Sequence, residues 1–287
     1  MEAALGKTSI RGVVAALGLF FAVTAGFCFS GTPKLLLAVT PEPNAGPGAV
    51  DSLLDAGSYA AADSVATAHL QTVEFLSSSG DLRYARALLD LARVRVEQDR
   101  LEEADDLLLA SASIAKADQE DESDLFADIL MWRARIAVSL GRHAAARPLY
   151  EKSLDIKTAL LGAEDPACIP SLTGLATIAL IDGDFEEAET LFRRALGLAG
   201  STANHVPAIA DTAAIGAHDK VSGAPGPADG AHIQAARWII DAVIGLATTQ
   251  GYRGDYEAAE ATVRPYLEAM LTAHGVENGR AVLLMLS

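Results

Sequence analysis

Histidine, cysteine and clustered acidic residues are the side chains of this sequence whose chemistry could support catalysis or metal binding. The six histidines lack metal-ligand spacing, such as two histidines four residues apart on one helix. The acidic run from Asp118 to Asp124 lacks the glycine and the spaced ligands of a calcium-binding loop. We interpret this run as a solvated connection between helices, with Ser123 or Asp124 as the N-cap of the second helix.

The remaining candidates for chemistry also lack partners in the sequence. Cys168 has no basic residue close in sequence, which favours a buried or unreactive thiol. Gly6-Lys7-Thr8 has the ending of a phosphate-binding loop, but it lacks the preceding glycine and strand. No nucleophile motif, kinase motif or paired-carboxylate arrangement is visible. The sequence therefore predicts a protein without enzymatic activity, metal or cofactor.

Composition indicates helices as the elements that carry these residues. Hydrophobic residues make up 51% of the chain and aromatic residues only 6%, and the abundance of alanine and leucine favours helix over strand. We therefore expect an all-α fold. The net charge of -16 repels phosphate backbones, which argues against a nucleic-acid partner.

The N-terminal region contains a long uncharged segment at residues 12–33, preceded by the basic flank 1–11. A stretch of this length approaches the ~20 residues that a membrane-spanning helix needs. Lys7 and Arg11 before it favour a cytoplasmic N-terminus. The first interpretation is a transmembrane signal anchor that leaves the rest of the chain outside the cytoplasm.

The alternative is a signal peptide cleaved after a small residue such as Gly26 or Ser30, which would release a secreted or periplasmic protein. In either case residues 34–49 are rich in proline and glycine and read as an extended linker. The folded domain is expected to span residues 50–287.

Beyond residue 50 one pattern recurs: a glycine or aspartate, an apolar or aromatic residue two positions later, and an alanine three positions after that. Successive alanines of this repeat-defining column lie 42 residues apart, and the last follows after 71 because of an insertion at about residues 200–230. The column alanines are Ala62, Ala104, Ala146, Ala188 and Ala259. Self-similarity at a fixed period predicts a stack of repeats.

Each repeat reads as two antiparallel helices joined at the glycine or aspartate, which ends the first helix in a left-handed conformation. A second alanine lies twelve residues before each of the last four column alanines, for example Ala134 before Ala146. Small residues at both positions let the two helices approach closely. Because no repeat buries its apolar face alone, the repeats are expected to stack into a solenoid.

The pattern resembles the tetratricopeptide repeat, in the 42-residue variant found in kinesin light chains. The resemblance covers about residues 57–275 and is strongest at 141–196, where GRHAAARPLYEKSLDIKTALLGAEDP occurs. Asp165 stands where that variant usually has histidine. The resemblance implies a right-handed superhelical solenoid whose first helices line a concave groove. The first repeat keeps only residues 50–56 of its first helix and is expected to cap the stack.

The resemblance also assigns residues to the groove by register. Arg93, Arg135 and the nearby Arg86 are expected to pair with carboxylates of a partner peptide, and Met131 and Trp132 to supply an apolar anchor. The alternative is local ion pairing, because Asp90 and Glu97 flank Arg93 on its own helix. The next repeat contributes two neutral positions, Thr173 and Thr177.

The sequence therefore predicts a membrane-tethered, non-catalytic scaffold that binds a protein or peptide partner. The alternative from another class is a truncated or regulatory portion of a larger signalling enzyme, in which such repeats follow a membrane span. Fold by itself does not decide between the two.

Overall fold

The computed structural model of the chain describes residues 47–55, 57–76, 81–118, 122–200 and 227–266. The described residues are helical, with short turns and no strand among them. They divide into two compact units. We call residues 47–171 with 227–235 the N-terminal unit, and residues 172–200 with 236–266 the C-terminal unit.

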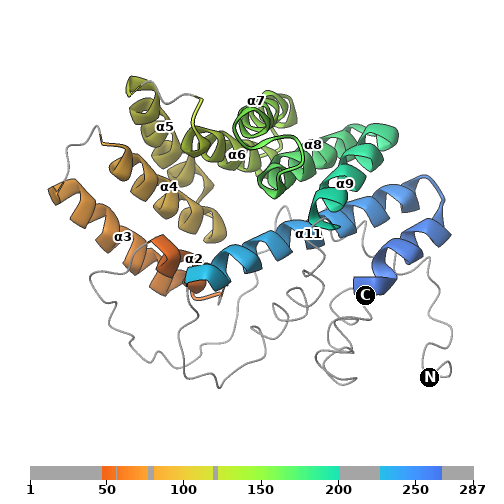
Figure 1. Cartoon of the computed structure of the whole chain (residues 1–287), viewed down its shortest axis with the longest axis horizontal. Helices are drawn as coiled ribbons and strands as arrows, with labels where there is room; N and C mark the ends of the chain where they lie inside the picture. The colour runs from red at the N-terminus through yellow and green to blue at the C-terminus, as the bar shows by residue number, and fades with distance from the viewer. Residues whose placement is uncertain (1–46, 56, 77–80, 119–121, 201–226, 267–287) are drawn as a thin grey trace, which may run out of the picture. The chain divides into compact units, whose positions relative to one another are not determined.

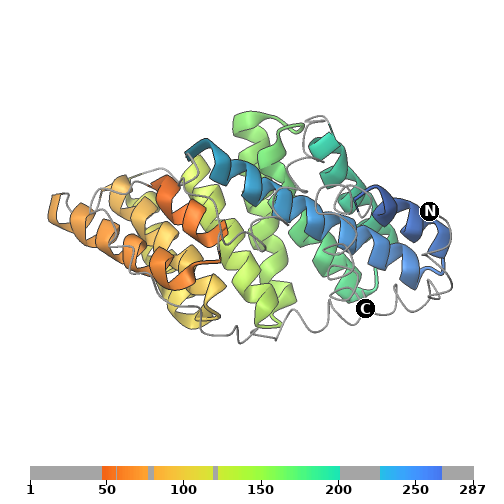
Figure 2. The same ribbon diagram turned by 90° about the horizontal axis from the view of Figure 1, so that it is seen from below.

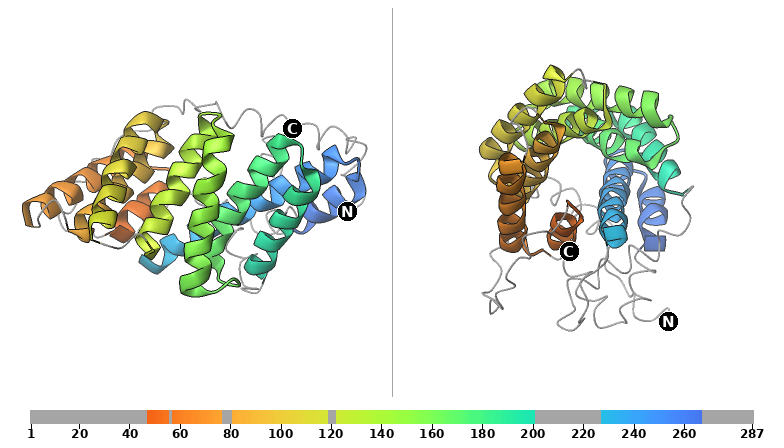
Figure 3. Two further views of the ribbon diagram at one scale, coloured as in Figure 1. Left: turned by 90° about the horizontal axis from the view of Figure 1, so that it is seen from above. Right: turned by 60° about the vertical axis from the view of Figure 1, so that its left-hand side comes forward.

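The N-terminal unit is a succession of helices in which each contacts the next (Figures 1 and 2). The first helices of successive repeats, α2, α4 and α6, also contact one another and form one layer. Figure 3 shows the same helices from two further sides. The helices are α2 (Pro47–Asp55), α3 (Tyr59–Leu76), α4 (Leu82–Glu97), α5 (Leu101–Ala117), α6 (Asp124–Ser139) and α7 (His143–Leu161), followed by the short 3-10 helix η1 (Pro166–Cys168).

The C-terminal unit continues the alternation of first and second helices. Phe185 of α9 stacks on Tyr252 of α11 with ring centroids 5.7 Å apart, and Glu189 of α9 pairs with Arg253. The elements are α8 (Ile169–Asp182), α9 (Phe185–Gly200), α11 (Pro227–Tyr252) and a helix over residues 256–266. α8 and α11 each cross the division between the two units.

The predicted left-handed turns are present in all five repeats. The turn residues are Gly57, Asp99, Gly141, Gly183 and Gly254, each with φ between 61° and 87°. After each turn a backbone N–H reaches back five residues to a helix carbonyl, as in the bond of 2.7 Å from Arg142 to Ala137. This bond is the Schellman arrangement, which satisfies a carbonyl left over at the helix end.

The alanine columns pack as predicted. All five column alanines are buried, and so are the four alanines twelve residues before them. Two serines add polar ties between the helices of a pair: Ser111 donates to the Ala85 carbonyl at 2.7 Å, and Ser153 donates to the Ala127 carbonyl at 2.8 Å. The two bonds are 42 residues apart, so one contact is repeated in consecutive repeats.

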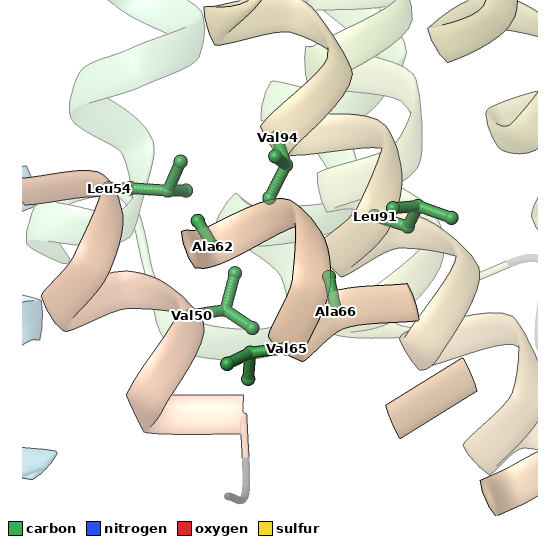
Figure 4. Close-up of a cluster of buried hydrophobic side chains, with 7 residues drawn as sticks. All are labelled: Val50, Leu54, Ala62, Val65, Ala66, Leu91 and Val94. Atoms are coloured by element: carbon green, nitrogen blue, oxygen red, sulfur yellow. The ribbon is translucent and has the colours of Figure 1, made fainter. Parts of the chain in front are cut away.

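The N-terminal half-repeat exists as expected and begins slightly earlier. α2 starts at Pro47, so the last three residues of the predicted linker 34–49 are helical. Proline suits this first position because a helix start leaves its N–H without a partner. Val50 and Leu54 of α2 join residues of α3 and α4 in one apolar cluster (Figure 4).

Other boundaries differ from the prediction or fall outside the described residues. α11 already begins at Pro227, so the predicted insertion 200–230 is shorter at its C-terminal end. The predicted anchor 12–33 and its flank 1–11 lie outside the described residues, as does the C-terminal end of the predicted solenoid after residue 266. Within the described ranges, no helix has the length and apolar character needed to cross a membrane.

Candidate partner-binding surface

The first helices of the N-terminal unit bring five of the seven predicted groove residues together. Arg86 and Arg93 lie on α4, and Met131, Trp132 and Arg135 lie on α6. α4 contacts α6 directly, and positions 42 residues apart are in register, so Arg93 and Arg135 occupy equivalent places. The N-cap residues that start these helices are Asp81, which accepts from the Arg83 N–H, and Ser123, which accepts from the Phe126 N–H as predicted.

Arg93 is held by two carboxylates within the fold. Its Nη2 lies 2.6 Å from Asp51 Oδ1 on α2, and its Nη1 lies 3.5 Å from Asp90 Oδ1 on its own helix. Only 11% of the Arg93 side chain is exposed. The alternative of local pairing is therefore confirmed for Asp90. The stronger contact comes from a residue one full repeat earlier, which sequence proximity did not indicate.

Trp132 lies beneath both arginines of this column. The guanidinium carbon of Arg93 is 5.6 Å from the centre of its ring, and that of Arg135 is 4.9 Å away. Cations at this distance are attracted to the negative face of an aromatic ring. Met131 and Trp132 are both buried, with Trp132 only 4% exposed, so they do not form an exposed apolar surface. Trp132 packs against the two arginines instead.

Arg135 and Arg86 are the more accessible cations of this surface. Arg135 Nη2 is 3.4 Å from Glu97 Oε1 of α4, and Arg86 Nη1 is 3.4 Å from Asp128 Oδ2 of α6. Both contacts are longer than the 2.7–2.9 Å of a good charge-assisted hydrogen bond. The exposed fractions of the two side chains are 30% and 40%. Glu97 thus pairs with Arg135, the arginine of the next repeat.

A buried lysine extends this network to α7. Lys157 pairs with Asp124 and lies 2.9 Å from Asp128, the residue that also contacts Arg86. Burial by itself lowers the pKa of Lys157, but the charges and hydrogen bonds of Asp128 and Asp124 outweigh it, and the pKa is raised. Lys157 therefore stays protonated and ties α7 to α6.

Thr173 and Thr177 lie in the C-terminal unit on α8. The Thr177 hydroxyl donates to the Thr173 backbone carbonyl at 2.8 Å, a bond within one helical turn. The Thr173 side chain is buried and its hydroxyl has no hydrogen-bond partner in the structure. The two threonines thus lie in a different unit from the arginines. The candidate surface therefore consists of the cluster on α4 and α6.

Three carboxylates of this surface were not predicted as site residues. Asp51 and Asp128 lie 42 residues from Arg93 and Arg86 respectively, so ion pairs join equivalent positions of neighbouring repeats. The 42-residue spacing between each aspartate and its arginine was the signal in the sequence that could have predicted these ion pairs. The third, Asp90, is 3% exposed, and burial raises its pKa to about 6, with Asp51 adding to the rise and Arg93 and Arg86 opposing it.

The candidates for chemistry do not assemble into a reactive site within the described residues. Cys168 is buried and its thiol lies 3.7 Å from the Gly162 carbonyl, which agrees with the predicted unreactive thiol. In the described ranges, no three His, Cys, Asp or Glu side chains are grouped so that they could hold a metal ion. The surface on α4 and α6 is a set of paired charges, which is suited to non-covalent contacts.

The match to a known protein family agrees with the repeat geometry. Residues 125–201 match the Tetratricopeptide repeat family. This segment begins in α6 and ends after α9, so it covers the repeats on both sides of the division between the units. The prediction of tetratricopeptide repeats is confirmed for it. No curated protein sequence matches the chain.

One solved structure has the same type of fold. The crystal structure of BtubC (BKLC) from P. vanneervenii is similar over 94% of both chains, with a TM-score of 0.52 and 18% identity. A Podosopora anserina protein with nearly identical TPR-like repeats is similar over 80% of this chain and 98% of its own, with a TM-score of 0.49 and 17% identity. At such identities the likeness to BtubC extends to the fold alone.

Proposed function

We propose that this chain is a non-catalytic scaffold that binds a partner polypeptide on the surface formed by α4 and α6. Its repeats would stack as a right-handed superhelical solenoid, with this surface on the concave side. Tetratricopeptide repeats typically mediate protein–protein interactions, and this chain carries such repeats at residues 125–201. The observation that supports this particular surface is the placement of Arg86 and Arg135, two partly exposed cations, on adjacent first helices.

The partner is expected to offer carboxylates to these two arginines. A guanidinium group presents its donors in a planar fork that matches a carboxylate. Trp132 keeps the Arg135 guanidinium over its ring and so limits the side-chain freedom that binding would otherwise remove. Since the chain carries a net charge of -16, its long-range field opposes a strongly acidic partner. A segment with isolated carboxylates among neutral or basic residues fits both conditions.

A peptide array tests this proposal with a defined probe. The peptides would share one neutral sequence and carry zero, one or two Asp or Glu residues at different spacings. Removing both cations by Arg86→Gln with Arg135→Gln should weaken binding of carboxylate peptides about 10-fold or more, because hydrogen bonds to charged groups contribute ~1.5–3 kcal/mol. Unchanged binding in the double variant would refute the assignment of this surface.

The chain offers a matched control in Arg193 and Arg264. Both are on second helices, are 60% exposed and pair within one helical turn, with Glu189 and Glu260 respectively. Arg193→Gln with Arg264→Gln also removes two positive charges, but from another part of the chain. Peptide binding should be retained in this control, and equal loss in both double variants would indicate a general charge effect instead of a site.

The membrane tether is proposed from the sequence at residues 12–33 and leaves the repeats outside the cytoplasm. Membrane fractionation of the full chain tests this tether. Leu19→Arg is the perturbing variant, because a charged residue near the centre of a spanning helix costs ~2.5–3.5 kcal/mol on insertion scales. The anchor is expected to keep the chain in the membrane fraction after a carbonate wash. Recovery of a shortened chain in the soluble exported fraction would favour a cleaved signal peptide.

A further inference from the structure

Asp90 occupies a position that is otherwise uncharged in the repeats. The equivalent residues of the following repeats are Trp132, Gly174 and Gly245, two residues before the second alanine of each first helix. Asp90 is 3% exposed, and its Oδ2 is buried without a hydrogen-bond partner in the structure. A buried carboxylate that is incompletely paired costs folding free energy, so its presence calls for a physical explanation.

Asp90 competes with Asp51 for one guanidinium group. Arg93 contacts Asp51 of α2 through Nη2 at 2.6 Å and Asp90 of α4 through Nη1 at 3.5 Å. The other charged group that acts on Asp90 is Arg86 on the same helix, which is itself paired with Asp128 of α6. When Asp90 is ionised, it repels Asp51 and draws on the same arginine.

The Arg93–Asp51 contact adds a charged link to the apolar packing that holds the short helix α2. α2 has nine residues, which is shorter than the ~12–15 residues at which an isolated helix becomes even marginally stable. It is held by Val50 and Leu54 in the cluster with Ala62, Val65 and Val94 (Figure 4). The ion pair is the charged tie between α2 and α4 in the described residues.

We propose that Asp90 makes the docking of α2 sensitive to pH. When Asp90 is protonated, the Arg93 guanidinium pairs with Asp51 without competition, and α2 packs more tightly against α4. When Asp90 is ionised, this docking of α2 is weakened. The proton comes from solvent, and no covalent bond changes. The helix α2 of the terminal half-repeat would then be docked more firmly at acidic pH and would detach more easily near neutral pH. This inference concerns the first helix of the stack and is independent of partner binding.

The pKa of Asp90, raised mainly by burial to about 6, places the change in an accessible range. A carboxyl whose folded-state pKa exceeds its ordinary value of about 3.9 binds its proton more tightly in the folded state. Its favourable contribution is therefore complete below about pH 4 and is lost as the pH rises through about 6. Two pKa units correspond to a change of about 100-fold in the opening equilibrium as an upper limit.

Hydrogen exchange of the full chain at pH 5 and pH 7 tests the proposal, with protection factors corrected for intrinsic exchange rates. The amides of residues 51–55 should be several-fold, up to about 10-fold, more protected at pH 5, because only part of the full change falls between these two pH values. Asp90→Asn, which imitates the protonated acid, should give high protection at both pH values. Asp51→Asn should give low protection at both, because Arg93 then no longer links α2 to α4.

The matched control is Asp105→Asn. Asp105 also pairs with an arginine, Arg133, at 2.9 Å, but it lies on α5 and its side chain is 32% exposed. This variant should keep the difference between pH 5 and pH 7 in α2. Equal protection of α2 at the two pH values in the unmodified chain would overturn the proposal, as would the same pH dependence in Asp90→Asn. Failure of Asp90→Asn to fold would also contradict it, since the neutral side chain should stabilise the junction.

Discussion

Gly245 provides a sharp test of the packing in the C-terminal unit. It lies in α11, in the same register position as Asp90 and Trp132 of the earlier repeats. A Cβ atom at Gly245 would lie 2.2 Å from Cζ and 2.4 Å from Cε1 of Phe192, a fully buried ring on α9. The prediction is that Gly245→Ala destabilises this unit.

Two opposing contributions decide the sign. Alanine is favoured over glycine in a helix interior by about 1 kcal/mol, so substitution in open space would stabilise the chain. Here the ring would have to move by roughly 1 Å or more to reach ordinary contact distance, in an interior that is close-packed. Overpacking of this kind costs typically ~1–3 kcal/mol, occasionally more. Because the contact would be far shorter than ordinary van der Waals distance, we expect a net loss of about 1–2 kcal/mol.

Gly197 is the matched control, since it lies in α9 with no atom within 4 Å of an added Cβ. Gly197→Ala should stabilise the chain by about 0.5–1 kcal/mol. Urea unfolding followed by circular dichroism would compare the two variants with the unmodified chain. Because the chain contains two units and Trp132 lies in the N-terminal one, the transition of the C-terminal unit should be followed by fluorescence of Trp238 in a Trp132→Phe background.

A double-mutant cycle with Phe192→Leu tests the cause. Shortening the ring alone should destabilise the unit, because a buried side chain loses volume. When Gly245→Ala is already present, the smaller side chain at position 192 should cost less, with a coupling of about 1–2 kcal/mol. A raised urea midpoint for Gly245→Ala, or strictly additive effects in the cycle, would refute the argued contact between the two residues.

Three further predictions concern the N-terminal unit. Ser153→Ala removes the donor to a buried carbonyl and should cost ~1–3 kcal/mol in urea unfolding, whereas Ser113→Ala at an exposed site should have little effect. Gly141→Ala, at a φ of 71°, should lower stability by about 1 kcal/mol, and a thermal midpoint equal to that of the unmodified chain would contradict the left-handed turn. The raised pKa of Lys157 means that its pairing with Asp128 stabilises the fold below its ordinary pKa and is lost as the pH rises through the raised value. Alkaline unfolding should therefore begin at lower pH in Lys157→Met, and an unchanged profile would argue against the buried pair.

The sequence by itself was sufficient for the repeat architecture. Left-handed turns depend on the local backbone, and glycine at Gly141 or Gly183 marks them whatever surrounds the turn. The column alanines are buried because close approach of two helices demands a small side chain, and this demand recurs in every repeat. Features that repeat at a fixed interval are readable because each copy is an independent sign of the same local geometry.

The roles of the surface residues were decided only by tertiary structure. Trp132 and Arg93 were expected to face a partner. In the fold the tryptophan is buried, and the arginine pairs with Asp51, a residue 42 positions away. The proton affinity of Asp90 likewise depends on burial between charges from two helices. Residue type and spacing specify which side chains share a register position, whereas pairing and desolvation depend on the distances between helices that are remote in the chain.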